Sequence, residues 1–217
     1  MSSFFMGIVV PFSILIPIGM FIYKNRHADK SIKVIFYYLI VAGFINAFAV
    51  GLAKFGIQNL PVLHIYTLVE ALFFLTYFSS IFKDKMIKKL IKVLMVVFPL
   101  LCIINFTFVQ SIFTFNTYTR PLEALIITTL CLAYFYKSGF SDNWLGSPIN
   151  WVNMGILLYF PTASIIFILS NYFTFVDLNK FLVGAIWNIH AFLVLGMYLV
   201  FTKAFSLIKK TTSGINV

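Results

Sequence analysis

Two glutamates, Glu70 and Glu123, lie within long apolar runs and are the residues best placed to do chemistry. A carboxylate in the hydrocarbon region of a bilayer is costly, and it usually faces a bundle interior or a water-filled cavity. Each glutamate is preceded by a Tyr-Thr pair and followed by Ala-Leu. This match fits either a parallel repeat or chance similarity. Chance is favoured because the two runs are only two helices apart, closer than a triple-helix repeat would place them.

His64, Thr67 and Glu70 recur every three residues and therefore share one broad face of a helix. A rise of 1.5 Å per residue places Glu70 about 12 Å below the start of its run. Arg120 precedes Glu123 by three residues, so the two side chains lie on the same helix face. Glu70 is expected to be either neutral, with its pKa raised by desolvation, or charged and paired with His64, His190 or Arg120.

Other polar residues fall at a similar depth in the second and seventh runs, in the half nearer the predicted outer side. The candidate ligand-binding residues are Asn46, His64, Thr67, Glu70, Arg120, Glu123, Asn188 and His190. They form either a ligand or ion pocket open to the outside, a structural network that only joins helices, or a metal or catalytic site. The aromatic residues Tyr159, Trp187 and Tyr198 are interpreted as packing residues.

The composition is that of a helical membrane protein. Of the 217 residues, 61% are apolar and 10% charged, whereas a soluble domain carries about 25% charged residues. The net charge of +10 does not indicate nucleic-acid binding, because the basic residues lie between apolar runs. Cys102 and Cys131 lie inside such runs and are interpreted as apolar fillers, with no disulfide and no metal site.

Seven apolar runs are each long enough to cross about 30 Å of hydrocarbon. They span residues 4–23, 32–53, 62–82, 89–110, 118–136, 149–171 and 178–202. The fold class predicted from them is all-α, a single seven-helix transmembrane domain. The first run lacks a preceding basic region and a small-residue cleavage site, so we expect it to be a retained span and not a signal peptide.

The basic residues predict the orientation of the chain. Of the 16 Lys and Arg residues, only Lys54, Arg120 and Lys180 lie at the ends opposite the main basic clusters. Because cytoplasmic loops carry the excess of Lys and Arg, the N-terminus is predicted outside and the C-terminus inside. The expected location is a bacterial inner membrane.

The sequence lacks the motifs of several kinds of catalytic and cofactor-binding site. The sequence has no HExxH, no P-loop and no haem attachment motif, and no lysine lies deep in the last run to hold retinal. His64 and Glu70 are about 9 Å apart along a helix axis, too far for one metal ion unless Thr67 or water lies between them. We therefore predict no cofactor and no metal. The loops are too short for a soluble catalytic domain, so the chain is expected to act in the bilayer or through a partner.

Three short patterns resemble those of uncharacterised bacterial seven-helix membrane proteins. They are His64-x-Tyr66-x3-Glu70, Asn153-x-Gly155-Ile156-Leu157-Leu158-Tyr159 and Asn188-x-His190. The resemblance covers most of the chain, and proteins of this plan are similar to the membrane input modules of sensor systems. It implies signalling, which for this chain requires a separate cytoplasmic or membrane partner.

The preferred interpretation is a receptor-like sensor that binds a small or lipidic ligand in an outer-half pocket. One alternative is a proton-coupled transporter with Glu70 as proton carrier and His190 or Glu123 as relay. Another is an intramembrane enzyme that uses the carboxylates as acid and base, and we expect this least. A one-sided pocket favours the receptor, because a transporter needs polar groups reaching both faces.

Overall fold

The computed structural model describes residues 4–24, 28–139, 144–175 and 180–208, and these residues form helices and connections without a strand. Helices occupy all seven stretches that the sequence predicts. They are η1 (Phe5–Val9), α2 (Val10–Ser13), α3 (Leu15–Lys24), α4 (Lys30–Lys54), α5 (Leu60–Ile81), α6 (Lys85–Ile104), η2 (Asn105–Val109), α7 (Thr119–Ser138), η3 (Trp144–Gly146), α8 (Pro148–Phe175) and α9 (Lys180–Ser206). Arg26, Lys209 and Lys210 of the predicted cytoplasmic clusters lie outside the described residues.

Six helical segments among the described residues are long and apolar enough to cross a membrane. They are Phe5–Lys24, Lys30–Lys54, Leu60–Ile81, Lys85–Val109, Pro148–Phe173 and Lys180–Ser206. These segments make the chain an integral membrane protein by length and composition. The helix that is not among the six, α7, has 20 residues but carries Arg120, Glu123 and Lys137, which lower its hydropathy.

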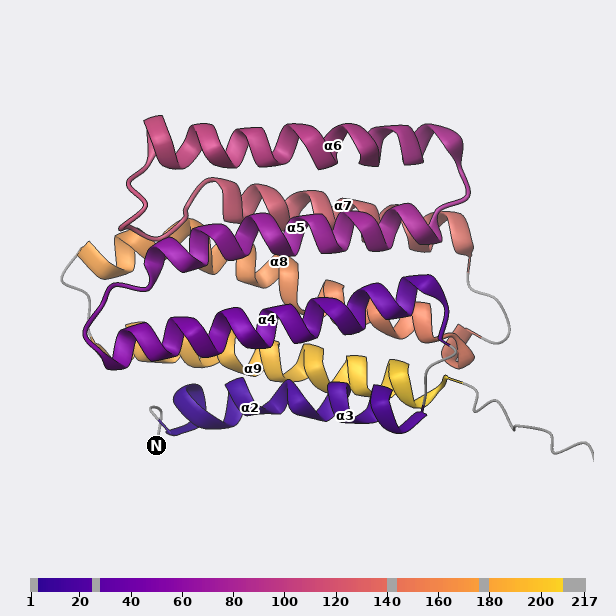
Figure 1. Cartoon of the computed structure of the whole chain (residues 1–217), viewed down its shortest axis with the longest axis horizontal. Helices are drawn as coiled ribbons and strands as arrows, with labels where there is room; N and C mark the ends of the chain where they lie inside the picture. Colours follow the sequence, from indigo (N-terminus) through magenta and orange to yellow (C-terminus); the bar gives the residue numbers. More distant parts are fainter. Residues whose placement is uncertain (1–3, 25–27, 140–143, 176–179, 209–217) are drawn as a thin grey trace, which may run out of the picture.

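The long helices run roughly along one common direction (Figure 1). Contacts link α3, α4, α5, α7, α8 and α9 in a closed ring, in that order, and α6 packs against α5 on the outside. One end of the bundle holds the α4–α5 connection at residues 55–59, and we call it the α4–α5 end. The opposite end holds the α5–α6 connection at residues 82–84, and we call it the α5–α6 end.

Local sequence explains where several helices begin and end. Pro61, Pro121 and Pro148 lie in the first turns of α5, α7 and α8, where a missing amide hydrogen costs no helical hydrogen bond. The side chain of Asp84 accepts hydrogen bonds from two amides of the first turn of α6. Gly139 ends α7 with a φ of 63°, a conformation that favours glycine.

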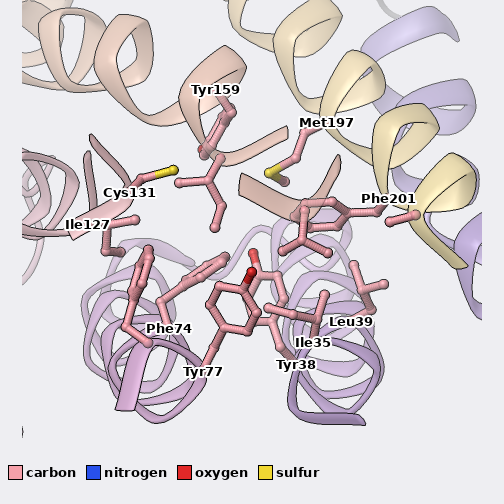
Figure 2. Close-up of a cluster of buried hydrophobic side chains, with 14 of the residues drawn as sticks. Ile35, Tyr38, Leu39, Phe74, Tyr77, Ile127, Cys131, Tyr159, Met197 and Phe201 are labelled. Atoms are coloured by element: carbon pink, nitrogen blue, oxygen red, sulfur yellow. The ribbon is translucent and has the colours of Figure 1, made fainter. Parts of the chain in front are cut away.

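An aromatic core fills the half of the bundle towards the α5–α6 end. Phe74, Phe78, Phe160, Phe201 and Phe205 come from three helices and are almost completely buried. The rings of Phe74 and Phe160 meet edge to face with centroids 5.0 Å apart. Figure 2 shows Phe74 and Phe201 on facing sides of this cluster. These rings make the centre of this half largely aromatic and apolar.

Two glycines let α8 and α9 approach closely. A Cβ atom added at Gly155 of α8 would lie 2.7 Å from Cε1 of Phe201, and one at Gly196 of α9 would lie 2.9 Å from Cδ2 of Leu158. Both distances are shorter than a carbon–carbon contact allows. Small residues therefore set the spacing of this helix pair, as they do in many membrane bundles.

Candidate ligand-binding site

Three charged side chains meet in the interior of the bundle. Glu70 of α5 and Glu123 of α7 each expose 1% of their surface, and Arg120 of α7 exposes 6%. Nη1 of Arg120 donates to Oε2 of Glu70 and to Oε2 of Glu123, the latter over 2.8 Å. The guanidinium thus joins two carboxylates, one of which lies 50 residues away in the sequence. We call these three residues the charged triad.

Two tyrosines complete the environment of Glu70. The hydroxyls of Tyr38 and Tyr66 both donate to Oε1 of Glu70, Tyr66 over 2.8 Å. Because Arg120 binds the other carboxylate oxygen, both oxygens of Glu70 have partners. The second oxygen of Glu123, Oε1, is buried and has no hydrogen-bond partner among the described residues. The two glutamates therefore differ, since one is fully bonded and the other is not.

Arg120 also bonds a residue of α8, which in turn contacts a residue of α9. Its Nη2 donates to the hydroxyl of Tyr159 over 3.1 Å, and that oxygen lies 3.2 Å from Nε2 of His190. The guanidinium carbon also lies 5.4 Å from the centre of the Tyr66 ring and 5.2 Å from that of Phe167. One continuous polar network thus connects α4, α5, α7, α8 and α9.

Asn116 fixes the first turn of α7, which carries Arg120. Its side-chain oxygen accepts hydrogen bonds from the amides of Thr119 and Arg120, at 3.0 and 3.2 Å, and from the Thr119 hydroxyl at 2.9 Å. Pro121 follows and has no amide hydrogen to satisfy. These bonds satisfy the free amides at the helix start and hold its charged face towards the bundle interior.

Residues 110–118, which precede α7, are hydrogen-bonded to α5 and α8 at the α4–α5 end of the bundle. The backbone amide and carbonyl of Phe115 both bond the side-chain amide of Asn171 on α8, each over 3.0 Å. The carbonyl of Thr114 lies 3.0 Å from Nε2 of His64 on α5. Because a carbonyl only accepts, Nε2 of His64 carries the hydrogen in this bond.

A cavity of about 470 Å³ lies between this segment and the charged triad, towards the α4–α5 end. Glu70, Arg120 and His190 lie in its wall, together with several aromatic and aliphatic side chains. His64 also lines it, and its buried Nδ1 has no hydrogen-bond partner among the described residues. A cavity of this size, apolar over most of its wall and with a few convergent polar groups, has the character of a small-molecule site.

The structure brings six of the eight predicted site residues to this cavity. They are Asn46, His64, Thr67, Glu70, Arg120 and His190. The other two do not line it. Glu123 is bonded to Arg120 away from the cavity, and the Asn188 side chain donates to the carbonyl of Gly184 on its own helix over 2.9 Å.

The sequence interpretation missed several contributors. Tyr38 carries no local signal, because its partner Glu70 lies 32 residues away. Asn116 bonds Thr119 and Arg120, three and four residues further on, and this spacing before a helix could have indicated it. Tyr66 lies one turn before Glu70 on the same helix, and that spacing could have indicated it. Tyr159 belongs to the hydrogen-bonded network, although the sequence suggested a packing role. The described residues contain no group of three or more His, Cys, Asp or Glu side chains placed to hold a metal ion.

A second buried polar network lies towards the α5–α6 end. The side-chain amide of Asn153 donates to the hydroxyl of Tyr77 over 2.8 Å and accepts from the thiol of Cys131 over 3.1 Å. Cys131 is thus a hydrogen-bonded thiol and not only an apolar filler. No hydrogen bond between described residues joins this network to the charged triad. The buried rings of Phe74 and Phe160 lie in the same half of the bundle as this second network.

No protein-family model matches the chain, and comparisons with curated proteins and with solved structures give no match. The resemblance to sensor input modules therefore stays a prediction.

Proposed function

We propose that the chain is a receptor-like protein with seven membrane spans that binds a small or lipidic ligand in the cavity beside the charged triad. Binding would be signalled to a separate cytoplasmic or membrane partner. The observation that carries this proposal is the cavity itself, which is apolar over most of its wall and has a few convergent polar groups, among them Arg120, Glu70 and His190. A ligand with one polar group and an apolar body matches that lining.

The surface of α7 supports its role as the seventh span. Its charged residues Arg120 and Glu123 point inwards and are buried, so they are hidden from lipid. Leu125, Leu132 and Tyr136 are exposed on the outer surface of the same helix, by 62%, 54% and 90%. A helix with buried charge and an apolar exposed face can cross a bilayer within a bundle.

We further propose an outside N-terminus and an inside C-terminus, in a bacterial inner membrane. Lys83, Lys85 and Lys88 lie at the α5–α6 end, whereas Lys54 and Lys180 are at the α4–α5 end. With the basic end in the cytoplasm, the cavity belongs to the outer half. A reporter fused after Val217 should be active only if it is a cytoplasmic type, and activity of a periplasmic reporter there would contradict the orientation.

The polar network offers a route for the signal. It connects five helices, and several of its side chains bond two or more partners. These are Tyr38, Tyr66, Glu70, Arg120 and Tyr159. A ligand that bonds Arg120 or His190 competes with Glu70 or Tyr159 for the same groups, and so changes which helices are held together. Differential binding to two arrangements of the helices is what a receptor requires.

A proton-coupled transporter is the second candidate. It is favoured by the presence of buried polar networks in both halves of the bundle, the charged triad in one and the Asn153–Tyr77 pair in the other. The aromatic core that fills the half towards the α5–α6 end is the reason to rank this function second. Uptake of protons into vesicles that contain the purified protein, driven by a substrate gradient, would support the transporter.

The receptor proposal is tested by filling the cavity. Gly184 lines the cavity and has open space beside it, so Gly184→Leu adds bulk without touching the charged triad. Gly51→Leu is the matched control, because it also has open space but does not line the cavity. The protein is extracted with its native lipids, and bound molecules are counted by native mass spectrometry.

We expect the parent protein and Gly51→Leu to retain a bound molecule that Gly184→Leu loses. Equal retention by all three proteins, or no bound molecule in the parent, would contradict the proposal.

A further inference from the structure

A second cavity of about 560 Å³ lies at the α5–α6 end, opposite the cavity beside the charged triad. It is formed by the start of α4, the end of α5, the α5–α6 connection and the first turns of α6, with Ile149 of α8. Its wall extends along α6 to Met95, about 15 Å from the helix start at 1.5 Å per residue. The cavity therefore reaches from the basic end of the bundle into the membrane-spanning part.

The charged groups around this cavity favour an anion. Lys30, Lys83 and Lys88 line it, and the only carboxylate in its described wall is that of Asp29. The nearby carboxylate of Asp84 does not line it and is engaged by Lys137 and by amides of α6. Positive charge thus exceeds negative charge among the described residues of the wall.

Free hydrogen-bond donors accompany the lysines. The hydroxyls of Ser31, which exposes only 6% of its surface, and Ser79 make no hydrogen bond with any described residue, whereas that of Ser80 donates to a backbone carbonyl. The side chain of Asp29 precedes α4 but does not cap it, so amides of the first turn of α4 have no side-chain cap among the described residues. Hydroxyls, helix amides and lysines together are the groups that bind phosphate.

We propose that the cavity at the α5–α6 end binds a phosphate group, presented by an anionic lipid headgroup or by a soluble phosphate. The deep wall along α6 favours the lipid, because the start of an acyl chain can lie beside Met95 while the phosphate meets the lysines. This inference does not depend on the function proposed for the first cavity. Under the proposed orientation, the site faces the cytoplasmic leaflet.

The test removes two lysines of the cavity. Lys30→Gln/Lys88→Gln deletes two positive charges of the wall, and the matched control Lys85→Gln/Lys89→Gln deletes two from α6 that do not line it. The full-length protein in detergent is titrated with phosphatidylglycerol or phosphatidylcholine and followed by native mass spectrometry. A separate titration uses inorganic phosphate at constant ionic strength.

We expect phosphatidylglycerol to bind the parent more tightly than phosphatidylcholine, and the cavity variant to lose about tenfold in affinity for it. The control variant should change less than about threefold. Binding of inorganic phosphate without binding of phosphatidylglycerol identifies a soluble phosphate as the source. Equal losses in both variants, or no phosphate-dependent binding, would overturn the proposal.

Ser31→Ala provides a check that is independent of charge and of folding. It removes one hydroxyl donor with little change in volume, and we expect about a threefold loss of phosphatidylglycerol affinity with an unchanged melting temperature. Unchanged affinity for every phosphate probe in this variant would remove Ser31 from the site. Together with an unaffected Lys30→Gln/Lys88→Gln protein, it would overturn the proposal.

Discussion

The charged triad makes a quantitative prediction about non-additive mutations. Arg120 bonds both Glu70 and Glu123, so either glutamate can be replaced while the guanidinium keeps one carboxylate partner. Glu70→Gln also keeps an acceptor oxygen for the hydroxyls of Tyr38 and Tyr66. We therefore expect each single Glu→Gln variant to lose only about 1 kcal/mol of unfolding free energy, the value of one hydrogen bond.

The double variant Glu70→Gln/Glu123→Gln is different, because it leaves a buried guanidinium without a carboxylate. A buried charge that loses its partner destabilises a protein by about 3–5 kcal/mol. The double variant should therefore exceed the sum of the single variants by about 1–3 kcal/mol. Arg120→Gln, which leaves two buried carboxylates without a cation, should be as damaging as the double variant.

The assay is reversible unfolding of the purified proteins in mixed micelles, followed by loss of helical circular dichroism. Asp29→Asn serves as the control, because this carboxylate is exposed and should change stability by less than about 0.5 kcal/mol. Additive losses in the double variant would refute the reasoning. A loss of 3–5 kcal/mol in Glu70→Gln alone would show that Glu123 does not compensate Arg120.

Three further predictions concern packing, a surface segment and pH. Gly155→Ala should destabilise the bundle by about 1–3 kcal/mol, because its Cβ would lie 2.7 Å from a core phenylalanine. The control Gly51→Ala, which has open space, should not be destabilised, and thermal unfolding compares the two variants. Asn171→Ala should speed hydrogen exchange in residues 110–118, since both bonds to their backbone are lost, and unchanged exchange would contradict their anchoring. A hydrogen bond from the lysine of α7, and then bonds from α6 amides, lower the pKa of Asp84. Because the folded-state pKa is lowered, the carboxylate contributes stability above its unfolded-state pKa and loses that contribution as pH falls through the folded-state pKa. The melting-temperature deficit of Asp84→Asn at pH ~7 should therefore begin to shrink near pH ~4 and vanish only below the lowered pKa.

The sequence predicts the helices well because each apolar run is as long as a membrane span and is bounded by charge or proline. The sequence predicts a span at residues 62–82, and helix α5 spans Leu60–Ile81. The α7 run shows the limit of this argument, because its charged residues lower its hydropathy although they are buried against other helices. Whether α7 spans a membrane depends on packing that a hydropathy pattern does not contain.

The site was predicted in part. The depth of Glu70 and its position on the same helix face as His64 were enough to place both beside one cavity. Arg120 was one of three possible partners for Glu70, and only the packing of α5 against α7 selects it. Asn188 was assigned to the site by depth, but an asparagine can also bond the backbone of its own helix, as it does here.

The central claim is that the cavity beside the charged triad holds a ligand, and an experimental map tests it most directly. The protein would be reconstituted in nanodiscs with the lipids of its native membrane and imaged by electron cryomicroscopy. We predict density within the 470 Å³ cavity, with its polar end in contact with Arg120 or His190. A well-resolved cavity that is collapsed, or that contains only separate water molecules, would contradict the claim.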